Sequence, residues 1–191
     1  MVLDYLSGDI DSILERITES HLKRYDRLQR SLLSTDVASN GVYQSTFNGY
    51  YRMQRRQQDW YGYFFSLLER EKRNRTVVFR DILDEVHQTK HRVEPSFSSK
   101  LVATIRPEMP VYDRYVRENL CLEIPGQSEP TDVRVRKFVG VYSILEARMT
   151  ELVQNGAFPQ LKKAFDDKFP CYAHFTDVKK LDLLLWQYRQ G

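Results

Sequence analysis

Residues 96–100 read Ser-Phe-Ser-Ser-Lys, and residues 110–116 read Pro-Val-Tyr-Asp-Arg-Tyr-Val. The first stretch predicts a short apolar helix that Ser96 caps and that two following prolines end. A second short helix is expected after Asp113. Lys100 and Asp113 therefore each lie near the start of a helix. If the two helices fold back on each other, an amine and a carboxylate can share one cleft.

The rest of the chain also predicts helices, because apolar residues recur at three- and four-residue intervals and no run alternates as a strand does. Helices are expected over residues 9–32, 47–73, 77–86, 97–105, 114–120, 131–149, 161–165 and 177–188. No linker-like composition divides the chain. The expectation is a compact all-α bundle of roughly eight helices, forming one domain over residues 1–191.

Composition places the chain among ordinary folded proteins. Its 191 residues carry a net charge of +3, which is compatible with a nucleic-acid partner but common in other proteins. Cys121 and Cys171 are isolated and favour a reducing compartment over a zinc site or a disulfide framework. No apolar run approaches the ~20 residues that span a bilayer, and the N-terminus lacks a signal-peptide layout. A soluble, cytoplasmic protein without membrane association is expected.

Several motifs that carry chemistry are absent from the sequence, including a phosphate-binding glycine loop, His-Glu-x-x-His, Cys-x-x-Cys and a nucleophile elbow. His87 and His91 are four residues apart, which would place them on one helical face. A third ligand is not evident, so exposed histidines near a helix end are favoured over a metal site. No metal and no cofactor are expected.

Lys100 and Asp113 are the better candidates for chemistry. Lys100 lies at the border of an apolar helical face, where its stem can pack while its amine reaches a cleft. Partial burial lowers the pKa of an amine and exposes its neutral, nucleophilic form. Asp113 lies where a carboxylate meets the free N–H groups of a helix start, which favours its ionised form. The alternative is a surface lysine with a packed stem and an ordinary capping aspartate.

The segment from Ser96 to Val116 resembles the active-site segment of the helix-hairpin-helix DNA glycosylases, most closely the 8-oxoguanine glycosylase branch. That family reads roughly Gly-Val-Gly-x-Lys, an apolar helix, and Pro-Val-Asp-x-x-Val. The resemblance implies an all-α fold, DNA as partner and a flipped nucleotide as substrate. It makes Lys100 the amine that attacks the sugar carbon and Asp113 the carboxylate that stabilises the sugar cation.

This sequence differs from the family pattern at three points. Ser96 and Ser98 stand where the family has the glycines whose backbone N–H groups hold a DNA phosphate, so the resemblance assigns that contact to these serines. Tyr112 separates the Pro-Val from Asp113, and the interval between Lys100 and Asp113 is shorter than usual.

A second nucleic-acid candidate is the predicted helix over residues 47–73. Arg52, Arg55 and Arg56 fall on one stripe with Arg70, and nearby aromatic residues could stack on bases. The alternative is a solvated helix face over an aromatic core, which Asp59 within the stripe favours. A smaller basic cluster, comprising Arg134, Arg136 and Lys137, is also read as a solvated face.

Three functions follow from these patterns. The first is a base-excision glycosylase or lyase that uses Lys100 and Asp113 on DNA. The second is a non-catalytic helical module that binds nucleic acid or protein. The third is an enzyme that acts on a small substrate in the same cleft.

Overall fold

The computed structural model describes residues 2–53, 57–126 and 128–189. All regular elements in these ranges are helices, so the predicted all-α class is confirmed. The chain forms two compact units that are described separately below. Unit 1 comprises Met1–Ile17 with Val78–Gly191, and unit 2 comprises Thr18–Val77. A single domain over residues 1–191 stays a prediction.

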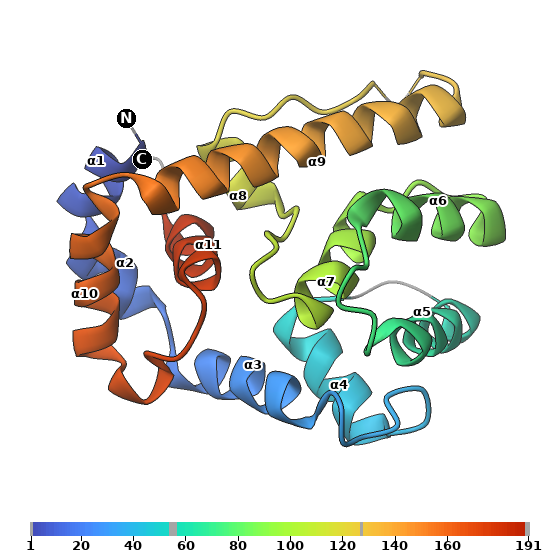
Figure 1. Cartoon of the computed structure of the whole chain (residues 1–191), viewed down its shortest axis with the longest axis horizontal. Coiled ribbons are helices and arrows are strands. Elements are labelled where there is room, and N and C mark those ends of the chain that lie inside the picture. The colour runs from blue at the N-terminus through green and yellow to red at the C-terminus, as the bar shows by residue number, and fades with distance from the viewer. Residues whose placement is uncertain (1, 54–56, 127, 190–191) are drawn as a thin grey trace. The chain divides into compact units, whose positions relative to one another are not determined.

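Unit 1 contains most of the helices (Figure 1). They are α1 (Val2–Gly8), α2 (Ile10–Arg16), α6 (Phe79–Lys90), α7 (Pro95–Ile105), α8 (Arg114–Asn119), α9 (Thr131–Gln154), α10 (Phe158–Lys168), a 3₁₀ turn (Pro170–Tyr172) and α11 (Asp177–Gln187). The helix α6 packs against α7 and α9, and α11 packs against α2, α8, α9 and α10. These contacts bury α7 and α11 most deeply.

In α7, every residue from Phe97 to Ile105 is buried. The long helix α9 covers the segment that follows α7. From α9, Tyr142 stacks on Phe79 of α6, with ring centroids 3.9 Å apart. The Tyr142 hydroxyl donates a hydrogen bond to the backbone oxygen of Pro110 (2.9 Å). This bond fixes the segment that leads from α7 to Asp113.

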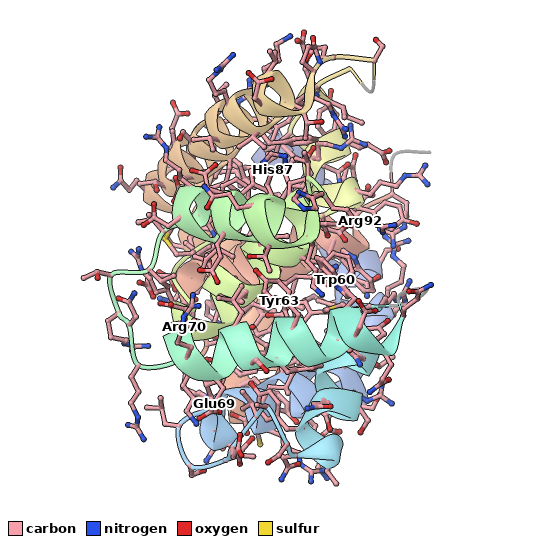
Figure 2. The ribbon with its side chains drawn as sticks, turned by 90° about the vertical axis from the view of Figure 1, so that its right-hand side faces the viewer. Trp60, Tyr63, Glu69, Arg70, His87 and Arg92 are labelled. Atoms are coloured by element: carbon pink, nitrogen blue, oxygen red, sulfur yellow. The ribbon has the colours of Figure 1, made fainter. Side chains whose placement is uncertain are left out.

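Unit 2 contains α3 (Glu19–Ser31), α4 (Gly41–Tyr50) and α5 (Gln58–Glu71). Phe47 of α4 meets Phe64 and Phe65 of α5 at ring-centroid distances of 5.4 and 5.5 Å, which forms an aromatic core. Figure 2 shows Trp60 and Tyr63 on one side of α5 and Glu69 on the other. Such a division follows from helical geometry, because nine residues correspond to about two and a half turns.

Glu69 joins α5 to the segment between α3 and α4. Its carboxylate accepts a hydrogen bond from the backbone N–H of Val37 (2.8 Å) and pairs with Lys72 (2.6 Å). Lys72 in turn donates to the backbone oxygen of Thr35 (2.8 Å). Charge-assisted hydrogen bonds from the end of α5 therefore hold the segment between α3 and α4 in place within unit 2.

Two predicted helices are interrupted, so the described residues form eleven α-helices where roughly eight were expected. The helix predicted over 9–32 appears as α2 and α3, and α1 precedes them. Ile17 and Thr18 adopt extended backbone angles at the break. Thr18 caps α3 by accepting a hydrogen bond from the backbone N–H of His21 (3.4 Å). Apolar spacing continues across this break, so the pattern alone predicts one helix.

The helix predicted over 47–73 is likewise divided into α4 and α5. Tyr51 and Arg52 form a turn, and Arg52 has a φ of 50°, which no right-handed helix accommodates. Arg52 therefore does not share a continuous helical face with Arg70, and that part of the prediction is wrong. Arg55 and Arg56 lie outside the described residues.

None of the helices in the described ranges has both the length and the apolar character needed to cross a bilayer. Cys121 and Cys171 are both free and exposed.

Candidate functional site

The candidate site lies in unit 1, where a buried hydrogen bond joins α7 to the segment before α8. The backbone N–H of Tyr112 donates to the Ser99 hydroxyl oxygen (2.9 Å). The Ser99 hydroxyl donates its own proton to the backbone oxygen of Ser96 (3.1 Å). Ser99 directly precedes Lys100, and Tyr112 directly precedes Asp113. This bond therefore brings the two candidate side chains into the same region of unit 1.

Lys100 is buried, with 8% of its surface exposed. Its amine lies 5.6 Å from the centre of the Phe97 ring. Among the residues that the structure describes, none forms a hydrogen bond or an ion pair with this amine. Burial lowers the pKa of Lys100, and the charges of Asp113 and Glu94 oppose that shift in part. The result is an amine that is easier to deprotonate than a surface lysine.

Asp113 is the N-cap of α8, as the sequence predicts. Its carboxylate accepts a hydrogen bond from the backbone N–H of Tyr115 (2.9 Å). Burial nevertheless raises the pKa of Asp113, and the nearby charge of Asp182 raises it further. The Tyr115 N–H and the charges of Lys100 and Lys179 act in the opposite direction. The expectation that the helix start favours the ionised form of Asp113 did not include this desolvation.

The charges on α11 belong to the same region. Lys179 and Asp182 form an ion pair of 2.6 Å, and each residue is 6% exposed. The N-cap of α11, Thr176, accepts from the N–H of Lys179 (3.1 Å) and donates to the backbone oxygen of Pro107 (2.7 Å). That second bond ties α11 to the segment that leads to Asp113.

The sequence analysis missed Ser99, Lys179 and Asp182. A signal for the last two was present, since both lie in a helix in which six of the other nine residues are apolar. Charged side chains in such a helix have no solvated face to occupy and are expected to pair. Ser99 gave no local signal, because its partner lies thirteen residues away.

Ser96 is not the N-cap that the sequence predicts for α7, whereas the predicted contact of Ser96 and Ser98 with a DNA phosphate stays a prediction. The helix begins at Pro95 with Glu94 as its N-cap residue, so Ser96 is not the cap. Proline at this position is favourable because it has no N–H to lose. Ser98 is fully buried, and both its N–H and its hydroxyl donate to the backbone oxygen of Glu94, each at 3.0 Å. In this conformation the Ser98 donors serve the helix start.

Of the remaining charged candidates, Arg52, Arg136 and Lys137 are exposed and Arg134 is half-buried. Arg52 lies at the surface of unit 2, in the turn after α4. On α9, Arg136 pairs with Asp132 (3.4 Å) and Lys137 pairs with Glu129, as expected of a solvated face. Within the described ranges, no three His, Cys, Asp or Glu side chains are grouped closely enough to hold a metal ion.

Comparison of this chain with models of known protein families, with curated proteins and with solved structures found no match in any of the three. The glycosylase resemblance therefore stays a prediction, and the chemistry has to be argued from the site itself.

Ser99→Ala removes the acceptor of the buried Tyr112 N–H. We expect the free energy of unfolding to fall by about 1–3 kcal/mol, because the donor loses its partner without gaining water. Ser143→Ala is the matched control, since Ser143 is an exposed helical serine that donates to Val139 of its own helix. Chemical denaturation measures both variants. Equal effects would show that the Ser99 bond does not hold this region together.

The pKa of Lys100 is expected to lie below the ordinary value of 10.5. NMR titration of ¹³C-labelled lysine measures it, with Lys100→Arg as the assignment control. In Asp113→Asn the pKa should fall further, because the negative charge of Asp113 raises it in the wild type. An unchanged or higher pKa in that variant would contradict the proximity of the two groups.

The lowered pKa of Lys100 also determines how the free energy of unfolding changes with pH. Because the folded protein holds this proton less tightly than the unfolded chain, charged Lys100 costs stability at neutral pH. That cost should fade as the pH rises through the lowered pKa towards 10.5. The wild type should therefore gain stability over this window relative to Lys100→Met, as measured by denaturation at each pH.

Proposed function

We propose that this protein is a base-excision DNA glycosylase or lyase in which Lys100 is the nucleophile and Asp113 assists it. The observation that carries the proposal is the Lys100 side chain, which is 8% exposed, has no ion-pair partner for its amine among the described residues and lies near a carboxylate. Buried lysines in folded proteins are normally paired, so an amine held in this way is costly. Sites that do chemistry are where such costs are retained.

The reaction requires the neutral form of the amine. The Lys100 nitrogen donates its lone pair to C1′ of the sugar, while the bond from C1′ to the base breaks and its electron pair leaves with the base. The base takes up a proton, and the nitrogen loses one. The C1′–O4′ bond of the sugar ring then breaks, its electron pair leaves with O4′, which takes up a proton, and the nitrogen lone pair forms the C1′=N bond of a protonated imine between Lys100 and the sugar. The lowered pKa of Lys100 supports this role because it raises the share of neutral amine near pH 7.

Asp113 has two tasks in this scheme. Its carboxylate can accept the proton that the Lys100 nitrogen loses, and its negative charge can stabilise the positive charge that develops on the sugar. The raised pKa of Asp113 makes it a better proton acceptor than an ordinary aspartate. Asp182 and Lys179 of α11 act on Asp113 through their charges and contribute to this tuning.

The helix α6 and the helix α7 support the same proposal. They pack against each other and are joined by residues 91–94, which makes them a helical hairpin that leads directly to Lys100. His91 ends α6 in the left-handed conformation, with a φ of 53°. Lys100 lies in the second helix of this hairpin, which is in keeping with the helix-hairpin-helix name of the resembled family.

Reductive trapping tests the proposal. Borohydride converts an imine between Lys100 and an abasic sugar into a stable covalent adduct, so wild-type protein incubated with a duplex bearing an abasic site should give a band of protein joined to DNA. Lys100→Ala should give none. Asp113→Asn keeps a helix-capping side chain and should slow adduct formation by about 10²-fold or more. A second duplex that carries 8-oxoguanine tests base removal.

Lys163→Ala is the control, since Lys163 is an exposed lysine on α10 and should leave the adduct unchanged. Peptide mapping of the adduct locates the modified amine. An adduct on Lys179, or one that persists in Lys100→Ala, would remove Lys100 as the nucleophile. DNA binding without any adduct would favour the non-catalytic module.

A further inference from the structure

A groove of about 450 Å³ lies between α3 and α4, entirely within unit 2. Three cations from α3 line it, Lys23, Arg24 and Arg27, and all three are exposed. No carboxylate is among the residues that line the groove. In the part of the chain that the structure describes, none of the three cations forms an ion pair. The one acidic residue on this stretch of α3, Asp26, is already paired with Arg30 (2.7 Å).

The two walls of this groove are held in place by aromatic packing. His21 of α3 stacks on Tyr50 of α4 with ring centroids 4.4 Å apart, and Tyr25 meets the same ring at 5.3 Å. Gly49 of α4 faces the cations, and a Cβ there would lie 3.7 Å from Nη1 of Arg24. That distance is an ordinary van der Waals contact, so the guanidinium of Arg24 lies next to α4 at this position and a side chain at residue 49 would be accommodated beside it. The charges are therefore presented by a fixed pair of helices.

Unit 2 as a whole is basic, not only its groove. Residues 18–77 contain eleven Lys and Arg against six Asp and Glu, a net charge of +5, whereas the whole chain has a net charge of +3. Residues 1–17 and 78–191 therefore carry a net charge of −2. The positive charge of the protein is concentrated in unit 2.

We propose that the α3–α4 groove binds the phosphate backbone of duplex DNA without reading its sequence. The role of the groove in base excision rests on the proposed function, but the binding experiment that tests the groove does not depend on that function. Lys23 and Arg24 lie side by side on one turn of α3 and Arg27 lies one turn further on, so the three cations span about 6 Å, and with Ser20 the lining spans about 10 Å. One DNA strand carries a phosphate about every 3.4 Å along the duplex axis, so the span matches about three phosphates.

The character of the lining favours this partner over others. It contains no large apolar side chain that could insert into a lipid surface, as interfacial helices do. It also contains no aromatic ring on which an unpaired base could stack, since Tyr25 and Tyr50 are buried beneath it. Cations and small polar residues alone suit phosphate contacts, which position a protein on DNA but carry no sequence information.

Fluorescence anisotropy with an undamaged, labelled 20-base-pair duplex tests the groove. Wild-type protein should bind, and its affinity should fall steeply with salt. The triple variant Lys23→Gln, Arg24→Gln, Arg27→Gln should bind about ten-fold or more weakly, and its salt slope should be smaller by about 2–3. The control removes the same charge from α10 by Lys162→Gln, Lys163→Gln and Lys168→Gln, and should behave nearly as the wild type.

A matched pair at Gly49 tests the groove without removing any cation. Gly49→Glu places a carboxylate among the three cations and should weaken binding, whereas Gly49→Gln, of similar size, should weaken it much less. Both changes replace a glycine within an exposed helix, so neither is expected to destabilise the fold. Thermal unfolding of each variant checks this.

The proposal is overturned if the wild type does not bind the duplex, if both triple variants lose affinity equally, or if Gly49→Glu and Gly49→Gln bind alike. It is also overturned if the three cations are needed for binding vesicles that contain phosphatidylserine but not for binding the duplex. The duplex in this experiment is undamaged, so DNA binding by the groove can be measured even in a protein that forms no covalent adduct. The two experiments therefore distinguish failure of the groove proposal from failure of the glycosylase proposal.

Discussion

The burial of α7 along nearly its whole length is the constraint on which unit 1 depends. Nine successive residues from Phe97 to Ile105 are buried, and four of them are polar. A buried polar group must find a partner inside the protein or pay for its desolvation. Ser98, Ser99 and Thr104 meet this requirement by donating their hydroxyl protons to backbone oxygens of residues 94, 96 and 100. Ser99 also accepts a hydrogen bond, and so positions the segment before Asp113.

Lys100 differs from the other buried lysines of unit 1. Lys180 pairs with Asp166 (2.6 Å) and donates to the backbone oxygen of Ala173 (2.7 Å), and Lys179 pairs with Asp182. Removing one partner of such a pair typically costs about 3–5 kcal/mol, so these lysines are structural parts of the core. The Lys100 amine makes no comparable bond among the described residues, and its burial lowers its pKa instead. The same environment therefore yields structural lysines where a carboxylate is in contact and an amine with a lowered pKa where the carboxylate is only nearby.

The sequence predicts some features of this region and not others. The features that it predicts depend on residues close together in the sequence, and those that it misses depend on residues far apart. The helix over 97–105 and the capping role of Asp113 depend on neighbours in sequence, and both are confirmed. The break at Thr18 escapes the pattern because buried residues on both sides of it keep a helical spacing. Burial of α7 and α11 on every side is set by the helices packed around them, and spacing within one helix cannot reveal it. The raised pKa of Asp113 follows from that same burial, so local reasoning from the helix start could not anticipate it.

The division of charge between the two units bears on how the proposed chemistry could operate on DNA. Unit 1 holds Lys100 and Asp113 but has a net charge of −2, and the carboxylate of Asp182 lies near Asp113. A polyanion gains little from such a surface, because affinity for duplex DNA comes largely from cations that displace its counterions. Unit 2 has a net charge of +5, and three cations along its groove have no ion-pair partner among the described residues, so it can supply that attraction. Binding and bond cleavage would then depend on different residues in different units. A site that does not need its own positive charge for binding can keep its one amine neutral, which is the form that attacks carbon.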